Sequence, residues 1–358
     1  MKKLKIKYAC SALITILAFS CTTRESKTDC AIMTELKLKR GDSIRSEQAL
    51  MSIQDTIVIE DPEDSPLRSI TKIIQSGDSL FILDGRADLL YLYDEHGSYL
   101  SKIGETGNGK NEYLSIEDFT IDQRTGNIII LTKNSRILAY SADGSFIFTQ
   151  ELCNALIWRI ESTDWGFIGS TNHQTHTEGE DACLLYCFDK DFNCTSKQVP
   201  VLPTWISAPQ MLSSAFQKVA NKTFFCDPVQ SLIFDVSSPD NIHAAQSIDL
   251  PNKMPIEKMQ SVMDFIANQL NYNWIMDYFA FDGNIFVSYI FDGAYSVALF
   301  NDQGEPLCMG RLNNGALPLL FHGKDGLILS PVSIDDENTD ETFGIVRWKF
   351  NTTGARNF

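Results

Sequence analysis

Two stretches decide the fold: LLYLYDEHGSYL at Leu89–Leu100 and RILAYSADGSFI at Arg136–Ile147. Each has apolar and aromatic β-forming residues, then a polar turn that contains Gly, then further β-forming residues. The turns begin at Tyr93 and Tyr140, so the unit recurs after forty-seven residues. This spacing indicates a repeated strand-turn-strand unit that is longer than one hairpin.

The repeat continues along the chain and predicts an all-β propeller. A period in the forties with four short strands per unit is typical of a β-propeller, in which each unit is one blade. The last unit has only three clear strands, and we expect Thr56–Glu60 to add the fourth and close the ring, which hides two sheet edges. The prediction is one domain over 51–358, with four-stranded antiparallel blades and a helical insertion at about 255–270. The six predicted blades are 67–103, 116–151, 157–199, 215–250, 277–311 and 317–350.

The N-terminal half also carries a family resemblance. The glycine-containing strand Gly77–Ile82, the turn Tyr93–Gly97, the glycine run Ile103–Gly109 and the pair Glu112-Tyr113 follow in order. In this order the sequence resembles the six-bladed β-propeller lipoproteins of Bacteroides-type bacteria, which are relatives of the NHL-repeat propellers. The resemblance is specific over residues 53–150, and it implies an architecture rather than a chemistry, since most members of that family have no known function.

The N-terminus predicts export and a lipid anchor. Four lysines precede the apolar run Ala9–Phe19, which is too short to span a bilayer and is typical of a signal peptide. The junction before Cys21 resembles a bacterial lipoprotein signal, which implies cleavage after residue 20 and acylation of the Cys21 thiol. We expect a tether over 21–50 and an outer-membrane lipoprotein on the periplasmic or cell-surface side. A membrane-anchoring helix, or a signal cut elsewhere, is the alternative.

Charge and cysteine content narrow the function classes. The net charge of −16 becomes −20 without residues 1–20, which hold four lysines and no acid. A chain this acidic does not neutralise phosphates, so we expect no nucleic-acid partner. Seven cysteines follow Cys21, and an odd number cannot pair completely within one chain. Buried free thiols are therefore expected rather than a disulfide framework or a metal site.

Two motifs in the first blades resemble enzyme loops without their structural context. The glycines of Gly104–Gly109 could cradle a phosphate, but no helix is expected after them, and Asn111 follows Lys110 where a Walker loop needs Ser or Thr. Gly77-Asp78-Ser79-Leu80 spells the nucleophile motif of GDSL hydrolases, and His243 lies in an Asp-x-x-His further along the chain. A hairpin turn is expected at Ser79, not the strand-to-helix turn that such a nucleophile requires.

Metal-binding patterns leave a second possibility open. His173, His176 and Glu178 lie in one polar segment with donor types suited to zinc or another transition metal. An acidic run at 335–341 has oxygen ligands for calcium but lacks the EF-hand spacing. We expect solvated loops and no cofactor. A metal-dependent hydrolase or lyase that uses the central pocket remains the alternative, and a ring of inward-pointing carboxylates or histidines would favour it.

The lengths of the predicted connections select a binding face. The connections expected at 170–182, 200–214, 251–276 and 331–344 are long, and all fall on the same face of the propeller. Trp205, between Pro203 and Pro209, is the best candidate contact, although it could equally cover the end of a blade. The sequence thus predicts a lipid-anchored envelope module that binds or scaffolds a protein or glycan, with Trp205, His173, His176 and Glu178 as candidate binding residues.

Overall fold

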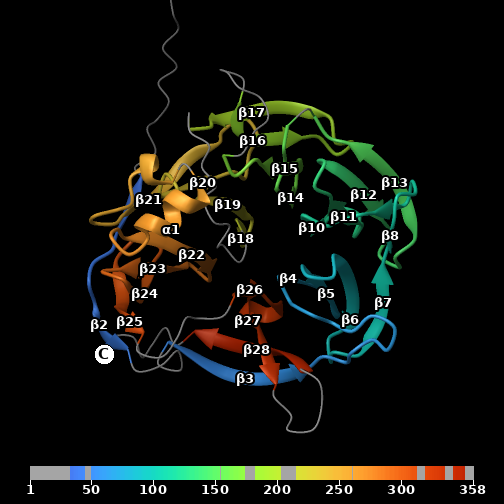
Figure 1. Cartoon of the computed structure of the whole chain (residues 1–358), viewed down its shortest axis with the longest axis horizontal. Helices are drawn as coiled ribbons and strands as arrows, with labels where there is room; N and C mark the ends of the chain where they lie inside the picture. Colours follow the sequence, from blue (N-terminus) through green and yellow to red (C-terminus); the bar gives the residue numbers. More distant parts are fainter. Residues whose placement is uncertain are drawn as a thin grey trace, which may run out of the picture. The chain divides into compact units, whose positions relative to one another are not determined.

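The protein is a ring of six sheets around a central axis, as the computed structural model shows (Figure 1). The structure describes residues 33–44, 50–153, 155–173, 182–202, 215–259, 261–312, 319–334 and 342–350. Residues Met33–Phe358 form one compact unit. Each sheet has four antiparallel strands of one blade, so the predicted fold class is confirmed.

The order of the strands in each blade follows the chain, except that the last blade takes its outer strand from the N-terminal region. From the axis outward, blade 1 contains β4 (Lys72–Ser76), β5 (Ser79–Asp84), β6 (Leu89–Asp94) and β7 (Tyr99–Ile103). Blade 2 contains β10 (Asp118–Ile121), β11 (Ile128–Leu131), β12 (Arg136–Tyr140) and β13 (Phe146–Glu151). Blade 3 contains β14 (Arg159–Thr163), β15 (Gly166–Ser170), β16 (Cys183–Phe188) and β17 (Cys194–Pro200). Blade 4 contains β18 (Phe216–Val219), β19 (Lys222–Asp227), β20 (Leu232–Asp235) and β21 (His243–Asp249). Blade 5 contains β22 (Trp274–Phe281), β23 (Asn284–Phe291), β24 (Ala294–Asn301) and β25 (Pro306–Leu312). Blade 6 contains β26 (Phe321–His322), β27 (Ile328–Ile334), β28 (Thr342–Phe350) and, as its outer strand, β3 (Met51–Val58).

Burial explains the composition of these strands. The middle strands are apolar at nearly every position, as in β11 and β16, because both of their faces pack against neighbouring blades. The outer strands β13 and β17 instead mix partly buried and exposed residues, because solvent reaches them. The core therefore lies between the blades, in a series of apolar clusters around the ring.

The repeated turn has a physical cause. In blade 1, Asp94 Oδ1 accepts the backbone N–H groups of His96 at 2.9 Å and Ser98 at 2.8 Å, which holds the chain in a tight turn. Gly97 has φ = 90°, a left-handed conformation, and an added Cβ would collide with the Val58 carbonyl. Asp189 and Asn301 accept backbone N–H groups in the same way in blades 3 and 5.

The N-terminal region closes the ring and also supports it elsewhere. β3 pairs antiparallel with β28, which confirms closure by an N-terminal strand. Two further strands lie within the segment predicted as a tether: β1 (Thr34–Lys37) and β2 (Asp42–Ile44). They pair in parallel with the outer strands of blades 4 and 5, and Leu36 and Leu38 are buried. Part of the predicted tether therefore belongs to the propeller, which begins well before residue 51.

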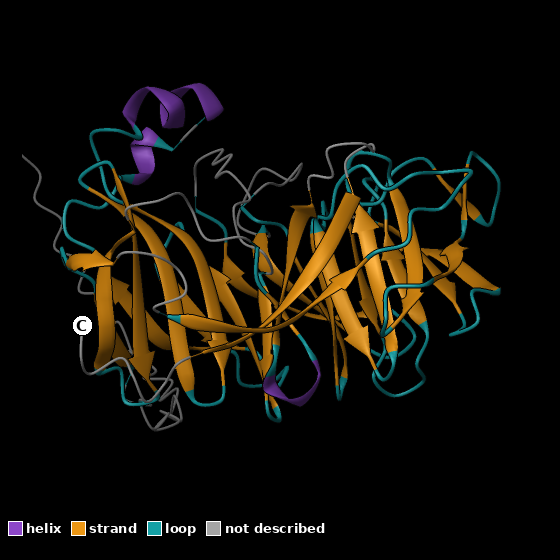
Figure 2. Cartoon of the chain, turned by 90° about the horizontal axis from the view of Figure 1, so that it is seen from below, coloured by secondary structure: helices purple, strands orange, loops and turns teal. Residues whose placement is uncertain are grey.

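One long connection carries the helical insertion. Between blades 4 and 5 the chain forms a short 3₁₀ turn, η2 (Ile256–Lys258), and the helix α1 (Val262–Asn268), which project from one face of the ring (Figure 2). The Ser261 hydroxyl caps α1 by accepting the Asp264 N–H at 3.0 Å. Another 3₁₀ turn, η3 (Lys324–Gly326), follows the inner strand of blade 6 on the opposite face.

The helical insertion buries only part of the apolar stripe that its sequence predicts. The residues at helical spacing are Ile256, Met259, Met263, Ile266 and Leu270. Met259 and Phe265 are buried and pack with Trp274, whose ring centroid is 5.0 Å from that of Phe265. Met263, which we expected on the same apolar stripe, is 74% exposed. The reason is the break between η2 and α1, because the cap at Ser261 starts a new helix and changes the phase of the stripe.

Candidate functional site

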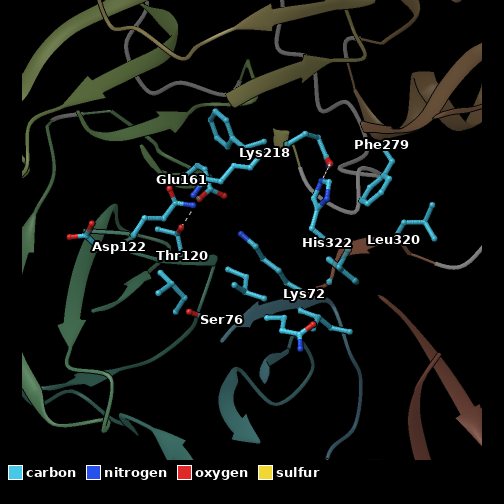
Figure 3. A pocket seen from close by; sticks show the side chains of 18 of the residues that line it. Lys72, Ser76, Thr120, Asp122, Glu161, Lys218, Phe279, Leu320 and His322 are labelled. Carbon is cyan, nitrogen blue, oxygen red and sulfur yellow. Dashed lines mark hydrogen bonds and ion pairs between the residues drawn. The ribbon is translucent and has the colours of Figure 1, made fainter. Parts of the chain in front are cut away.

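The inner strands of all six blades line a cavity of about 320 Å³ on the axis (Figure 3). Its wall reaches Gly126 and Gly323, which lie in the connections that follow the inner strands of blades 2 and 6. The α1 insertion precedes the inner strand of blade 5, and the two ends of an inner strand lie on opposite faces. The cavity thus extends toward the face opposite α1, where the connections are short.

A buried ion pair joins blades 1 and 2 at this wall. Lys72 Nζ lies 2.7 Å from Asp118 Oδ1 and donates to the Phe119 carbonyl at 2.8 Å. The side chains of Lys72 and Asp118 are 11% and 4% exposed. Asp118 Oδ2 also accepts the Ile160 N–H at 2.9 Å, so one carboxylate connects three blades. A charge in this position needs such partners, because burial without them is costly.

Glu161 connects blades 2, 3 and 4. Its Oε1 atom accepts from the Thr120 hydroxyl at 2.7 Å, from Lys218 Nζ at 2.8 Å and from the Ser162 N–H at 3.0 Å. Burial alone would raise the pKa of Glu161, but the charges of Lys218 and then Lys72 outweigh it and hold the pKa below its ordinary value. Glu161 is therefore a carboxylate at neutral pH, with Oε2 free of described partners.

His322 completes the wall from blade 6. Its Nε2 atom lies 2.8 Å from Gln217 Oε1 of blade 4, and its ring stacks on Phe279 of blade 5 with centroids 4.4 Å apart. Burial lowers the pKa of His322 to about 4, so the imidazole is neutral at pH 7. Because the Gln217 oxygen can only accept, Nε2 carries the proton and Nδ1 is an acceptor.

The cavity therefore presents paired charges and neutral polar groups. Within the described residues, no group of three or more His, Cys, Asp or Glu side chains could hold a metal ion. The carboxylate at the wall, Glu161, already pairs with Lys218 and the histidine pairs with Gln217. The described wall does not show the ring of carboxylates or histidines that would favour the metal-dependent hydrolase or lyase.

The structure places His173 away from the cavity wall, in a buried contact between blades 3 and 4. Its Nε2 atom lies 2.9 Å from Asp227 Oδ2, and its Nδ1 atom accepts the Leu202 N–H at 3.4 Å. Both side chains are only 2% exposed. Because both ring nitrogens are occupied, His173 is a structural residue here. It is not a solvated loop residue, contrary to the expectation from its polar segment.

The other predicted site residues lie outside the described part of the chain. They are Cys21, Trp205, His176 and Glu178. The whole acidic run at 335–341, considered for calcium, also lies there. Lipidation at Cys21 and contacts by Trp205 thus stay predictions. In the described segments, no helix has both the length and the apolar character needed to cross a membrane.

The structure also shows the conformation of the Gly77–Leu80 motif, the glycine run at 104–109 and the described cysteines. Ser79 begins β5 directly after a two-residue turn, as predicted, with no helix behind it. In the glycine run, the Gly109 N–H donates to Glu112 Oε2 at 2.7 Å, so a carboxylate of the chain itself takes that backbone group. Two short strands frame this loop, β8 (Glu105–Thr106) and β9 (Glu112–Tyr113). The six described cysteines are thiols rather than disulfide-bonded, and only Cys187 and Cys226 among them are buried.

Sequence reasoning missed the residues of the cavity wall. Lys72, Glu161, Lys218 and His322 each lie on the first strand of a blade. The available signal was a charged or polar side chain in the strand that opens a repeat, since that strand is nearest to the axis. In isolation each strand reads as an ordinary half-polar strand, because the partner of each charge comes from another blade.

Together, the ring and its axial cavity define a six-bladed β-propeller. The family model described as "Domain of unknown function (DUF4934)" matches residues 40–346. The chain belongs to this family. No curated protein matches the sequence.

Two crystal structures have similar folds. A candidate exported protein of Bacteroides fragilis has a TM-score of 0.70 and 16% identity, covering 88% of this chain and 100% of that one. A member of the DUF4221 family from Bacteroides vulgatus has a TM-score of 0.57 and 10% identity, covering 84% and 98%. At these identities the similarity shows the fold alone.

Proposed function

We propose that this protein is a lipid-anchored envelope module that docks another protein on the face that carries α1. The observation that carries the proposal is the exposure of three apolar side chains there: Met263 at 74%, Ile266 at 52% and Leu270 at 80%. Among the other large apolar side chains that are exposed in the described residues, at most two share one element, which are Ile53 and Val58 on β3. A gathered apolar surface on an otherwise charged chain is typical of a contact site.

The insertion holds this surface in a fixed position. Met254, Met259, Phe265 and Trp274 anchor it in a buried cluster, and the indole N–H of Trp274 donates to the Gln269 carbonyl at 3.3 Å. A preordered surface loses little conformational entropy on binding. Because the chain carries a net charge of −16, a partner with an apolar patch and a basic rim would be electrostatically complementary.

Export and anchoring are part of the proposal. The signal-like N-terminus with Cys21 supports them, and the similar Bacteroides fragilis protein is described as a candidate exported protein. We place the protein at the outer membrane, on its periplasmic or cell-surface side. Cys21→Ala should abolish acylation and release the protein from membranes, since stable anchoring requires acyl chains. Unchanged membrane retention of this variant contradicts the anchor.

The docking proposal is tested by affinity capture from envelope extracts. Met263→Asp with Leu270→Asp should lose the captured protein, and Trp205→Ala in the same set tests the predicted contact outside the described residues. Leu100→Asp with Leu114→Asp is the matched control, because Leu100 and Leu114 are 53% and 63% exposed on blade 1 and the loop that follows it. All variants should melt like wild type. Equal loss of capture in the control contradicts docking at α1.

A further inference from the structure

We propose that the axial cavity binds a neutral, hydroxyl-rich ligand the size of one sugar ring, such as the end of a glycan. This site lies toward the face opposite α1 and does not depend on the docking of a protein there. The proposal rests on four properties of the wall: its volume, its charge balance, its donors and acceptors, and its apolar side.

The volume of the cavity sets the size of the ligand. A space of about 320 Å³ is within the range of small-molecule sites. It corresponds to roughly ten water molecules at about 30 Å³ each, which leaves room for a ring compound of about a dozen non-hydrogen atoms. A longer glycan could enter only with its terminal unit.

The charge balance of the wall favours a neutral ligand. Lys72 pairs with Asp118, and Lys218 pairs with Glu161. Asp122, at the rim, pairs with Arg124 at 2.8 Å. An ionic ligand would leave one charge uncompensated in a poorly solvated space. The overall charge of −16 further opposes the entry of an anion.

The free donors and acceptors match hydroxyl groups. Among the described residues, Lys218 Nζ has one acceptor and Lys72 Nζ has two, which leaves N–H groups on both ammonium groups. Glu161 Oε2 and His322 Nδ1 remain as acceptors. A hydroxyl group both donates and accepts, so several hydroxyls on one ring can satisfy both kinds of group. A purely apolar ligand would leave them unpaired.

An apolar side completes the wall. Figure 3 shows Thr120, Asp122 and Glu161 on one side of the cavity and Phe279 and Leu320 on the other. Phe279 and Leu320 are each only 1% exposed and form the base of this side, so the apolar contact for the C–H groups of a sugar ring comes from the partly exposed Ile74 in the same lining. The hydroxyls of the ring then face the polar groups. A site of this kind has a few fixed polar groups in an otherwise apolar pocket.

Saturation-transfer NMR on the full-length protein tests the proposal. The probes are the methyl glycosides of glucose, galactose, mannose and N-acetylglucosamine, with glucuronate and glucosamine as charged analogues. We expect at least one neutral glycoside to bind, and glucuronate and glucosamine to bind about 10-fold more weakly than that glycoside, the equivalent of about 1.4 kcal/mol. Absence of binding by all four neutral glycosides overturns the proposal, as does tighter binding of glucuronate or glucosamine.

Two variants place the ligand in the cavity. Ser76→Phe adds a bulky side chain at the rim, where Ser76 is exposed and its hydroxyl makes no hydrogen bond with a described residue. Glu161→Gln with Lys218→Gln removes one ion pair without leaving a lone charge. Both should reduce binding at least about 10-fold. Lys102→Gln with Glu105→Gln removes an ion pair of 2.9 Å outside the cavity and should bind like wild type.

Each outcome decides between sites. Wild-type binding by Ser76→Phe, with a wild-type melting temperature, would show that sugars bind elsewhere and overturns the proposal. Loss of binding in the Lys102 and Glu105 control also contradicts it. The α1 variant Met263→Asp with Leu270→Asp should retain sugar binding, so failure of the docking proposal and failure of this one give different results.

Discussion

Two histidines in this propeller show how differently the same side chain can be used. His173 is fully enclosed between blades 3 and 4, and both of its ring nitrogens are occupied. His322 lines the axial cavity, with one nitrogen bound to Gln217 and its ring stacked on Phe279. The sequence around His173 is rich in acids and was the better metal candidate, whereas His322 lies next to Leu320 and Phe321.

The difference comes from what each histidine meets in space. Asp227, which takes the His173 N–H, also accepts the Val229 N–H at 3.0 Å, so this region is a closed hydrogen-bonded unit. At the axis, the groups of the wall keep donors and acceptors that no described residue uses, because none of the described strands lies inside the ring. We therefore expect changes near His173 to affect folding alone, and changes at the axis to affect both folding and binding.

The largest effect is expected for Asp118→Ala at the axis. It leaves Lys72 buried without its counter-ion and the Ile160 N–H without an acceptor. The loss in free energy of unfolding should be about 4 kcal/mol, measured by urea denaturation. Asp302→Ala, in an exposed turn of blade 5, is the control and should change little. A loss no larger than in this control would show that the inner strands do not depend on the ion pair.

Asp227→Ala should have the next largest effect, about 3 kcal/mol in the same measurement. The change leaves the His173 Nε2–H and the Val229 N–H unpaired in a buried place. Sugar binding at the axis should persist at temperatures where this variant is folded. Loss of sugar binding in the folded variant would remove the distinction between the two regions.

The pH dependence of stability separates the two histidines further. Because the pKa of His322 falls from 6.5 to about 4 on folding, the unfolded chain binds a proton between these values that the folded protein does not. Stability from this group is present above pH 6.5 and decreases as the pH falls toward 4. His322→Gln should remove about 2 kcal/mol of the stability lost between pH 7.5 and 4.5.

The control for this experiment is His243→Gln on β21, in the outer part of blade 4. Both variants and wild type are unfolded with urea at the two pH values. If the His322 variant loses as much stability at low pH as wild type and the His243 variant do, then His322 is not the neutral, cavity-lining group described here.

The smallest effect concerns metal ions. Because both nitrogens of His173 are engaged, addition of Zn²⁺ or of a chelator should shift the melting temperature by less than about 1 °C. His176→Ala with Glu178→Ala should behave in the same way. A larger stabilisation by Zn²⁺ that disappears in these variants would restore the metal site predicted as the alternative at 173–178.

Much of the fold could be predicted because the repeat is local. The turns at Tyr93 and Tyr140 mark successive units, and the number of units follows from their spacing. The contribution of β3 was predictable as well, because the last unit lacked a strand. β1 and β2 were missed because each is short, and their burial depends on outer strands of blades far along the chain.

The candidate site could be predicted far less well. Polar side chains at 173–178 attracted attention because they are adjacent in sequence, but His173 finds its partner Asp227 in the next blade. The phase of α1 also escaped prediction, since a single cap at Ser261 determined which apolar residues are exposed. For His173 the deciding contact is a tertiary one, and for α1 it is the single hydrogen bond of the cap.

The amino-acid sequence by itself determined the blade, its turn and the number of blades, because strand periodicity and turn geometry are properties of a few neighbouring residues. Only the tertiary structure decided what lies at the axis. Lys72, Glu161 and His322 come from three blades, and their convergence depends on the register and twist of strands separated by long stretches of chain. A cavity formed in this way has no local signature, since Lys72, Glu161 and His322 are each completed by a residue of another blade.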